Sequence, residues 1–235
     1  QNLNNLAELG LIDTSKKISN TGGRNATAYS YIEKARYAVG LYLNRHHINC
    51  VAVDLSGNVI SLIRVRENFD LNDDNYLRKI GETVEEVKKD TGLSDDRFLG
   101  VGIAVQGLIS DDGERVTYGL TLNFTGVTRA DIAKYIPYHN RLFHDSAAAG
   151  YAEVWDRNDL DDAFYLSLSN SVGGAVIVAN KIFEGERRKS GEIGHMTIIP
   201  KAGDIVAKGV VLTQCVEQMC LQNMRMVIWK SSLNY

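Results

Sequence analysis

Glu192 and His195 lie three residues apart in the glycine-rich stretch Ser-Gly-Glu-Ile-Gly-His-Met. Gly191 and Gly194 allow the backbone to turn tightly, so the carboxylate and the imidazole can face the same side of a cavity. A hydrogen-bond acceptor beside a group that both donates and accepts suits the hydroxyls of a sugar. The alternative is a glycine-rich loop that carries a surface glutamate and a structural histidine.

A second carboxylate, Asp145, stands between an apolar stretch that predicts a strand and a run of small residues that predicts a helix. We expect this helix to extend to Trp155. Its positive end favours the ionised carboxylate, which can accept hydrogen bonds from ligand hydroxyls. An aspartate at a helix start is also a common N-cap, so a purely structural role is the alternative.

Hydrophobic periodicity outlines the elements that position these residues. Residues 75–91 predict an amphipathic helix, on which Glu85, Glu86, Lys88 and Lys89 form a solvated face. Strands are expected over 38–42, 48–55, 59–65, 99–105, 163–169 and 175–179.

Composition limits the class of protein. The chain has 235 residues, of which 44% are apolar and 23% charged, enough for one large domain or two lobes. It contains no run of about 18 apolar residues and no basic-then-apolar start, so we expect neither a membrane span nor secretion. Its three cysteines show no disulfide spacing, which fits a reducing, cytoplasmic location. Because the chain starts at Gln1, we expect its true N-terminus to lie upstream.

The first part of the chain has the pattern of a small basic head. Residues 1–47 carry a net charge of +3 and the remainder carries −6. A leucine-rich helix ending at Gly10, a short strand, a Thr-Gly-Gly-Arg turn and a strand over 26–31 predict the latter half of a winged helix-turn-helix. An ordinary helix and hairpin is the alternative. The polar candidates for reading base edges or contacting phosphates are Gln1, Asn2, Asn5, Lys16, Lys17 and Arg24.

Two ordered sets of motifs carry a resemblance to a known family. The first is Leu-x-x-Leu-x-x-Leu-Gly-Leu-Ile followed by Thr-Gly-Gly-Arg, and the second runs from Phe164 to Pro200 as strand, Gly-Gly, strand, Asn-Lys turn, and Gly-Glu-Ile-Gly-His-Met. Both resemble the ROK family of repressors, open reading frames and kinases. The resemblance implies an α/β, actin-like (ribonuclease-H-like), two-lobed sugar-kinase fold, preceded by the remnant of a winged helix-turn-helix. It divides the chain into a partial DNA-binding domain over 1–35 and a sugar-binding domain over 36–235, incomplete after about residue 203.

The same resemblance assigns roles to individual residues. In sugar-binding relatives the asparagine of an Asn-Leu-x-Gly turn contacts sugar hydroxyls, which implies that role for Asn123, although an asparagine can also simply satisfy its own turn. Asp145 matches the general base of the kinases. The implied sugar contacts are therefore Asn123, Asp145, Glu192 and His195.

The chain departs from the kinases of the family at their phosphate loop. Those kinases end the first strand in Asp-x-Gly-Gly-Thr, whereas this chain has Tyr42 for the carboxylate and Asn44 and Arg45 for the glycines. Bulky side chains fill the space that phosphates need, and no metal-holding carboxylate remains. We therefore expect no phosphoryl transfer. An ATP-dependent, glucokinase-like sugar kinase is the alternative, favoured by Asp145 and the glycine loops Gly173-Gly174, which could equally be packing glycines.

The second departure concerns zinc. The resemblance implies a structural Cys3His zinc site that uses His195, but the expected cysteine pair is absent after Gly203. Either the site is lost or residues between Gly203 and Asp204 are missing from this chain.

Taken with the resemblance, the sequence favours a repressor that binds a sugar effector and operator DNA as a homodimer or dimer of dimers, with no membrane partner. A binding module without DNA or enzyme roles is a third possibility.

Overall fold

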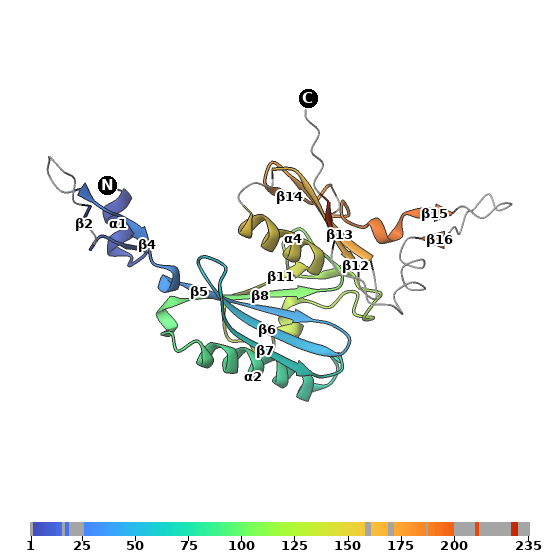
Figure 1. Ribbon diagram of the computed structural model, residues 1–235. Coiled ribbons are helices and arrows are strands. Elements are labelled where there is room, and N and C mark those ends of the chain that lie inside the picture. The colour runs from blue at the N-terminus through green and yellow to red at the C-terminus, as the bar shows by residue number, and fades with distance from the viewer. Residues whose placement is uncertain are drawn as a thin grey trace, which may run out of the picture. The chain divides into compact units, whose positions relative to one another are not determined.

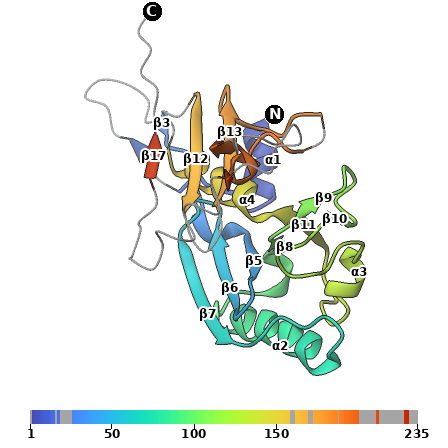
Figure 2. The same cartoon turned by 90° about the vertical axis from the view of Figure 1, so that its right-hand side faces the viewer.

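The computed structural model describes residues 2–15, 17–18, 26–157, 161–168, 172–186, 188–199, 210–211 and 227–229. The chain divides into two compact units, which Figures 1 and 2 draw from two sides. One unit comprises Gln1–Ile103 and Ala130–Arg141, and the other comprises Ala104–Arg129 and Leu142–Tyr235. No helix among the described residues is long and apolar enough to cross a membrane.

The head begins with the short helix α1 (Asn2–Glu8), after which Gly10 adopts φ 67°. This backbone conformation suits glycine and explains why the helix ends there. Four two-residue strands follow: β1 (Ile12–Asp13), β2 (Lys17–Ile18), β3 (Ala26–Thr27) and β4 (Ser30–Tyr31). β1 pairs with β4 and β2 pairs with β3, both antiparallel. The expected strand over 26–31 is therefore divided between two pairings, and the Thr-Gly-Gly-Arg turn lies outside the described residues.

A five-stranded sheet in the order β11-β8-β5-β6-β7 contains the meander that the sequence predicts. Its strands are β5 (Tyr37–Leu43), β6 (His47–Asp54), β7 (Val59–Arg66), β8 (Phe98–Val105) and β11 (Asn140–His144). Side chains of β5 and β6 alternate between buried and half-buried along each strand. On β6, Cys50 is fully buried as a free thiol, and burial raises its pKa to about 12.

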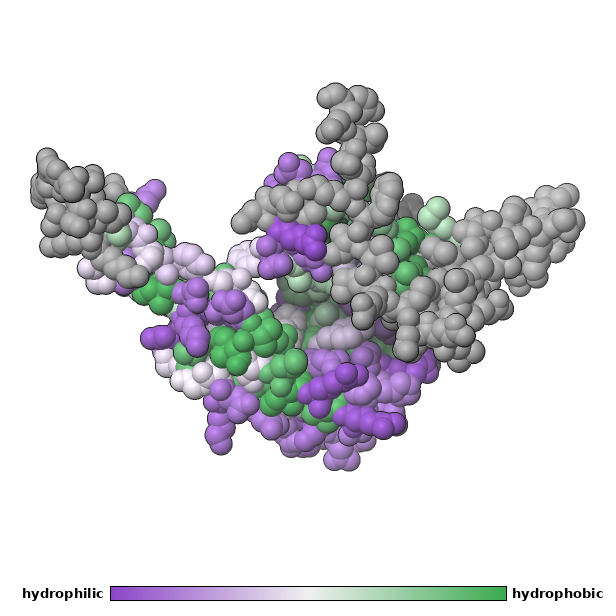
Figure 3. Space-filling model, viewed as in Figure 1, coloured by the Kyte–Doolittle hydropathy of each residue, from purple (hydrophilic) through white to green (hydrophobic). Residues whose placement is uncertain are grey.

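Helix α2 (Asp74–Asp90) covers one face of this sheet through a stripe of apolar side chains that includes Ile80, Val84 and Val87. Asp73 caps the helix by accepting a hydrogen bond from the backbone amide of Asn75, at 2.9 Å. Figure 3 shows hydrophilic residues gathered over α2, as expected for its solvated face. One residue differs from that expectation. Lys88 is buried and donates to the Tyr138 hydroxyl at 2.7 Å.

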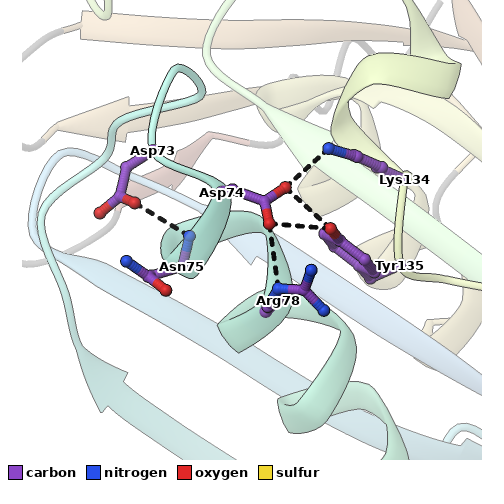
Figure 4. Close-up of polar contacts among 6 residues, drawn as sticks. All are labelled: Asp73, Asp74, Asn75, Arg78, Lys134 and Tyr135. Atoms are coloured by element: carbon purple, nitrogen blue, oxygen red, sulfur yellow. Dashed lines mark hydrogen bonds and ion pairs between the residues drawn. The ribbon is translucent and has the colours of Figure 1, made fainter.

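Two contacts tie α2 to the segment that follows the short helix α3 (Arg129–Ile132). The Asp74 carboxylate accepts hydrogen bonds from Lys134 at 2.6 Å and from the Tyr135 hydroxyl at 2.8 and 2.9 Å (Figure 4). Gly81, also on α2, lies so near Tyr135 that a Cβ would be 2.5 Å from the Tyr135 carbonyl oxygen. A glycine at this position is therefore required by close packing.

The second unit is built around helix α4 (Asp145–Asp156) and a sheet in the order β14-β13-β12-β17. Figure 2 shows α4 beside β12 and β13, and α4 contacts β14 as well. The sheet strands are β12 (Ala163–Leu168), β13 (Val172–Val178), β14 (Lys181–Phe183) and β17 (Val227–Trp229). The remaining elements are β9 (Leu108–Ile109), β10 (Val116–Tyr118), η1 (Glu33–Ala35), η2 (Asp95–Arg97), η3 (Ile193–His195), β15 (Thr197–Ile199) and β16 (Val210–Val211).

Candidate functional site

Asp145 lies at the point where a strand passes directly into a helix. β11 ends at His144, whose backbone is extended, and α4 begins at Asp145. Oδ1 of Asp145 accepts a hydrogen bond from the backbone amide of Ser146 at 2.8 Å. The hydrogen bonds and the ion pair of Asp145 with described residues all fall on Oδ1. Because an ionised carboxylate has about four acceptor sites, Asp145 has the capacity to accept a hydrogen bond from a ligand as well.

Asp145 and Glu192 both lie close to His144, for which the sequence predicts no role. Nε2 of His144 lies 3.5 Å from Oδ1 of Asp145 and 3.4 Å from Oε1 of Glu192. The side chains of His144, Asp145 and Glu192 are 23%, 23% and 26% exposed, so the cluster is partly shielded from water but still reachable. The signal available in the sequence was the position of His144, immediately before the candidate aspartate.

The pKa of Asp145 differs from the sequence expectation that the helix start favours ionisation. Burial raises this pKa above its ordinary value and is the largest influence on it. The nearby His144 and the Ser146 amide act in the opposite direction, and the negative charge of Glu192 raises the pKa further. Burial disfavours the charged form more than the helix start and its neighbours favour it.

Glycines allow the elements of this cluster to approach β13. A Cβ on Gly173 would overlap the Ser146 hydroxyl at the start of α4, and a Cβ on Gly191 would overlap the backbone carbonyl of Gly174. Gly174 itself approaches Phe164 so closely that a Cβ would lie 2.8 Å from its ring. Of the two interpretations of Gly173-Gly174, the structure supports packing glycines. They hold both acidic segments against the same strand.

Asn123 lies in a different setting from the two carboxylates. Its φ of 55° is in the left-handed region, which asparagine tolerates better than most residues, and its backbone amide donates to the carbonyl of Leu120 at 3.2 Å. Among the described residues, no hydrogen bond or ion pair joins Asn123 to Asp145 or Glu192. This geometry agrees with an asparagine that shapes its own turn, and a sugar contact from Asn123 stays a prediction.

His195 is described only through its backbone. It ends η3, in which the amide of Met196 donates to the carbonyl of Ile193 at 2.9 Å. Within the described part of the chain, no three His, Cys, Asp or Glu side chains are grouped so as to hold a metal ion. Cys215 and Cys220 lie outside that part. Because the cysteine pair of a Cys3His site is missing from the sequence after Gly203, the residues present do not fit a zinc ion at His195.

The turn between β5 and β6 is closed by the side chain of one of its own residues, Asn44. Oδ1 of Asn44 accepts hydrogen bonds from the backbone amides of His46 at 3.0 Å and His47 at 2.9 Å. Phosphate-binding loops use such amides to hold the anion. Arg45 is exposed beside the turn, and Tyr42 stands on β5 opposite Asn49. In this structure the amides of the turn already have a partner within the protein.

Of the residues predicted to contact DNA, the structure describes few. Asn2 and Asn5 are exposed on α1, and Lys17 lies in β2, where its side chain is not described. Gln1, Lys16 and Arg24 lie outside the described residues. DNA contacts from all six stay predictions.

Comparison with known proteins agrees with the fold and the motifs. A model of the ROK family matches residues 38–225. The xylose repressor of Bacillus subtilis (strain 168) is 26% identical over 184 residues, which cover 76% of this chain and 47% of the repressor. The N-acetylglucosamine repressor of Escherichia coli O157:H7 is 23% identical over 217 residues, covering 83% of this chain and 48% of that protein. The chain thus spans about half the length of the curated relatives it matches.

Solved structures show the same fold. A ROK family transcriptional regulator described as a homologue of the E. coli MLC protein superposes with a TM-score of 0.65 at 18% identity, covering 84% of this chain and 51% of that chain. The ROK hexokinase from Thermus thermophilus superposes with a TM-score of 0.56 at 23% identity, covering 70% and 54%. The α/β architecture of the actin-like sugar kinases, which the motifs implied, is therefore confirmed.

Proposed function

Because the chain belongs to the ROK family, we propose that it is part of a sugar-responsive transcriptional repressor that binds operator DNA and carries out no phosphoryl transfer. Two repressors that match most of this chain are named for xylose and for N-acetylglucosamine. Their names support a sugar or sugar derivative as the effector. The protein is proposed to act as a homodimer, because operators with paired half-sites are bound by two-fold symmetric proteins.

The observation that carries the proposal is the contrast between two polar sites. Asp145 and Glu192 meet in a partly exposed cluster that can accept hydrogen bonds from sugar hydroxyls. In the β5–β6 turn, by contrast, the amides of His46 and His47 are already bonded to Asn44. A protein with this pair of features can keep a carbohydrate site without a nucleotide phosphate site.

The proposed response to the effector is a shift between two states of the repressor. A sugar changes DNA affinity only if it binds one of these states more tightly than the other. Asn123, Asp145, Glu192 and His195 are the proposed contacts, and Asn2, Asn5 and Lys17 belong to the proposed DNA-binding head together with Gln1, Lys16 and Arg24. Effector binding then alters the affinity of the head for its operator.

A sugar kinase is the second candidate, favoured by the fold shared with the hexokinase and by Asp145 at the position of the kinases' general base. It predicts ATP consumption that depends on added sugar. We expect no turnover above background when the full-length protein is incubated with ATP, Mg²⁺ and D-glucose, D-xylose or N-acetyl-D-glucosamine. Sugar-dependent ADP formation would contradict the repressor-only proposal.

Effector binding is tested by thermal shift on the full-length protein with the same three sugars and their phosphates. A sugar at one hundred times its Kd stabilises the folded state by about 2.7 kcal/mol, which gives a clear rise in Tm. Asp145→Ala should abolish the rise. Asp156→Ala, at the other end of the same helix, is the matched control and should retain it.

DNA binding is tested separately. Duplexes enriched from a random pool by the full-length protein should shift in a gel, and the sugar that raises Tm should change the fraction shifted. A rise in Tm without any shifted DNA would leave a sugar-binding module and contradict the repressor. DNA binding that no sugar alters would contradict the effector role.

A further inference from the structure

His144 lies between the two carboxylates of the cluster and has no role in the function proposed above. Asp145 is the first residue of α4, and Glu192 immediately precedes η3, so the two acids belong to separate elements. One nitrogen of His144, Nε2, is within 3.5 Å of an oxygen of each. A single ring nitrogen thus joins two segments that are 47 positions apart in the sequence.

The geometry restricts the state of the imidazole. A carboxylate oxygen accepts hydrogen bonds and cannot donate one when ionised. If Nε2 carried a lone pair, it would repel both carboxylates, whereas a hydrogen on Nε2 attracts both. The similar distances of 3.4 and 3.5 Å are those of ion-pair contacts from one nitrogen to both acids, longer than ordinary hydrogen bonds. We therefore assign the hydrogen to Nε2.

The backbone around the cluster is already fixed by packing. The start of α4 touches Gly173 through Ser146, and the segment before Glu192 touches Gly174 through Gly191. These contacts fix the backbone positions of the two acidic residues but leave the orientation of their side chains open. The imidazole is placed to set that orientation.

We propose that His144 is a positioning residue that holds Asp145 and Glu192 together so that both can accept hydrogen bonds from one effector. The identity of that effector as a sugar rests on the proposed function. The influence of the neighbours on the pKa of Asp145 agrees with the arrangement, because His144 lowers it and Glu192 raises it. His144 acts through the two acids and needs no contact with the sugar itself.

Two substitutions separate positioning from packing. His144→Phe retains a ring of similar size but has no hydrogen-bond donor, and His144→Gln retains a donor that can lie between the acids. His46→Phe, at an exposed histidine of the β5–β6 turn, is the matched control. Each variant is first checked for an unchanged fold by circular dichroism.

Binding is measured by calorimetry on the full-length protein, with whichever of D-xylose, D-glucose and N-acetyl-D-glucosamine raises its Tm. His144→Phe should weaken binding at least about tenfold, by analogy with the loss of residues that orient the ligands of metal sites. His144→Gln should recover most of this loss, and His46→Phe should bind normally. Normal binding by His144→Phe would overturn the proposal.

A double-mutant cycle with Glu192→Gln adds a readout that packing alone would not move. In the Glu192→Gln background the second negative charge is absent, so His144→Phe should then weaken binding by less than about threefold. Effects of the two substitutions that simply multiply would overturn the proposal, since they would indicate that His144 contacts the sugar or acts independently of Glu192.

A measurement without ligand distinguishes failure of this proposal from failure of the proposed function. The carboxyl carbon of Asp145 is followed by NMR as pH is lowered in the wild type and in both variants. His144→Phe should raise the pKa of Asp145, because the neighbouring positive charge is lost. An unchanged pKa would overturn the positioning role even if a sugar binds. A raised pKa would support it even if none of the three sugars binds.

Discussion

Helices α2 and α4 both begin with an aspartate, and the two carboxylates have opposite surroundings. Asp74 accepts hydrogen bonds from Lys134 and Tyr135 and is paired with Arg78 at 3.0 Å (Figure 4). The bonds from Lys134 and then Tyr135 hold its pKa at about 2. Asp145 is more buried and has one imidazole nitrogen at 3.5 Å, and burial raises its pKa.

The difference indicates which carboxylate can serve a ligand. The oxygens of Asp74 are occupied by side chains of the protein, so this residue stabilises the contact between α2 and residues 134–135. Asp145 is held where ionisation is unfavourable and has few bonds to the described residues, an arrangement typical of functional sites. Residue type and helix position are the same in both cases. The partners make the difference.

The helices themselves differ in the same way. α2 buries large apolar side chains such as Ile80 and Val84, whereas the buried residues of α4 are Ser146 and Gly150. Each helix contains one glycine at a close contact. Gly81 lies nearest to the backbone of Tyr135, whereas the atoms nearest to Gly150 belong to side chains, first Cβ of Ala175 and then Cδ1 of Ile182.

The largest expected effect concerns these two glycines. Gly81→Ala should lower the free energy of unfolding by about 3 kcal/mol, since the added methyl group meets a backbone carbonyl that cannot move aside. Gly150→Ala should lower it by about 1–2 kcal/mol, because the added methyl group meets Cβ of Ala175, which is fixed to its strand, although Ile182 can shift and alanine favours the helix. Urea unfolding followed by circular dichroism measures both. Equal losses would mean that α2 and α4 are equally constrained.

The contact between α4 and β13 should show the next largest effect. Gly173→Ala places a methyl group on the Ser146 hydroxyl and should lower the free energy of unfolding by about 1–2 kcal/mol. The double variant Gly173→Ala/Ser146→Ala should recover most of this loss, since Cβ of Ser146 would remain 3.5 Å from the new methyl group. Additive losses in urea unfolding would show that the hydroxyl is not the obstacle.

Asp145→Asn should raise Tm at pH 7. A carboxyl whose pKa is raised by folding contributes stability below its unfolded pKa, and that contribution is lost as pH rises through the folded value. As pH rises above the unfolded pKa, Asp145 therefore carries a growing penalty for burying its charge, which asparagine avoids. The advantage of the variant should shrink toward about pH 4. A Tm below that of the wild type at pH 7 would contradict this assignment.

Asp74→Asn should give the smallest effect, in the opposite direction. A lowered pKa contributes stability above the unfolded value of about 4, and this contribution is lost as pH falls toward the folded value of about 2. Because the pair is largely exposed, we expect a fall in Tm of about 2 °C or less at pH 7, smaller still in high salt. Between about pH 4 and pH 2 the wild type should lose more stability than the variant. Parallel acid profiles would exclude Asp74 as the source.

Much of the fold follows from the sequence, because alternation along β5 and β6 and the apolar stripe of α2 are local patterns. The ROK motifs supplied the architecture that the comparisons confirm. The burial of Lys88 could not be read locally, since its partner Tyr138 lies 50 residues away. A helical pattern cannot reveal a partner that another segment provides.

For the candidate site, the sequence identified both acids but neither their connection nor their electrostatics. Local sequence does not connect His144 with Asp145, because neighbouring residues in extended backbone usually point apart, whereas the chain changes from strand to helix between these two residues. The role of Asn44 within its own turn was available in principle, because asparagine often bonds to amides two and three residues ahead.

The buried thiol of Cys50 is an internal probe for local opening of the five-stranded sheet. Only a thiolate reacts quickly with alkylating reagents, and a thiol with a pKa of about 12 is almost entirely protonated at neutral pH. Covalent labelling at this position must therefore await a transient opening of the sheet. The labelling rate of the Cys50 peptide in mass spectrometry would report how often that strand opens, without any inserted probe.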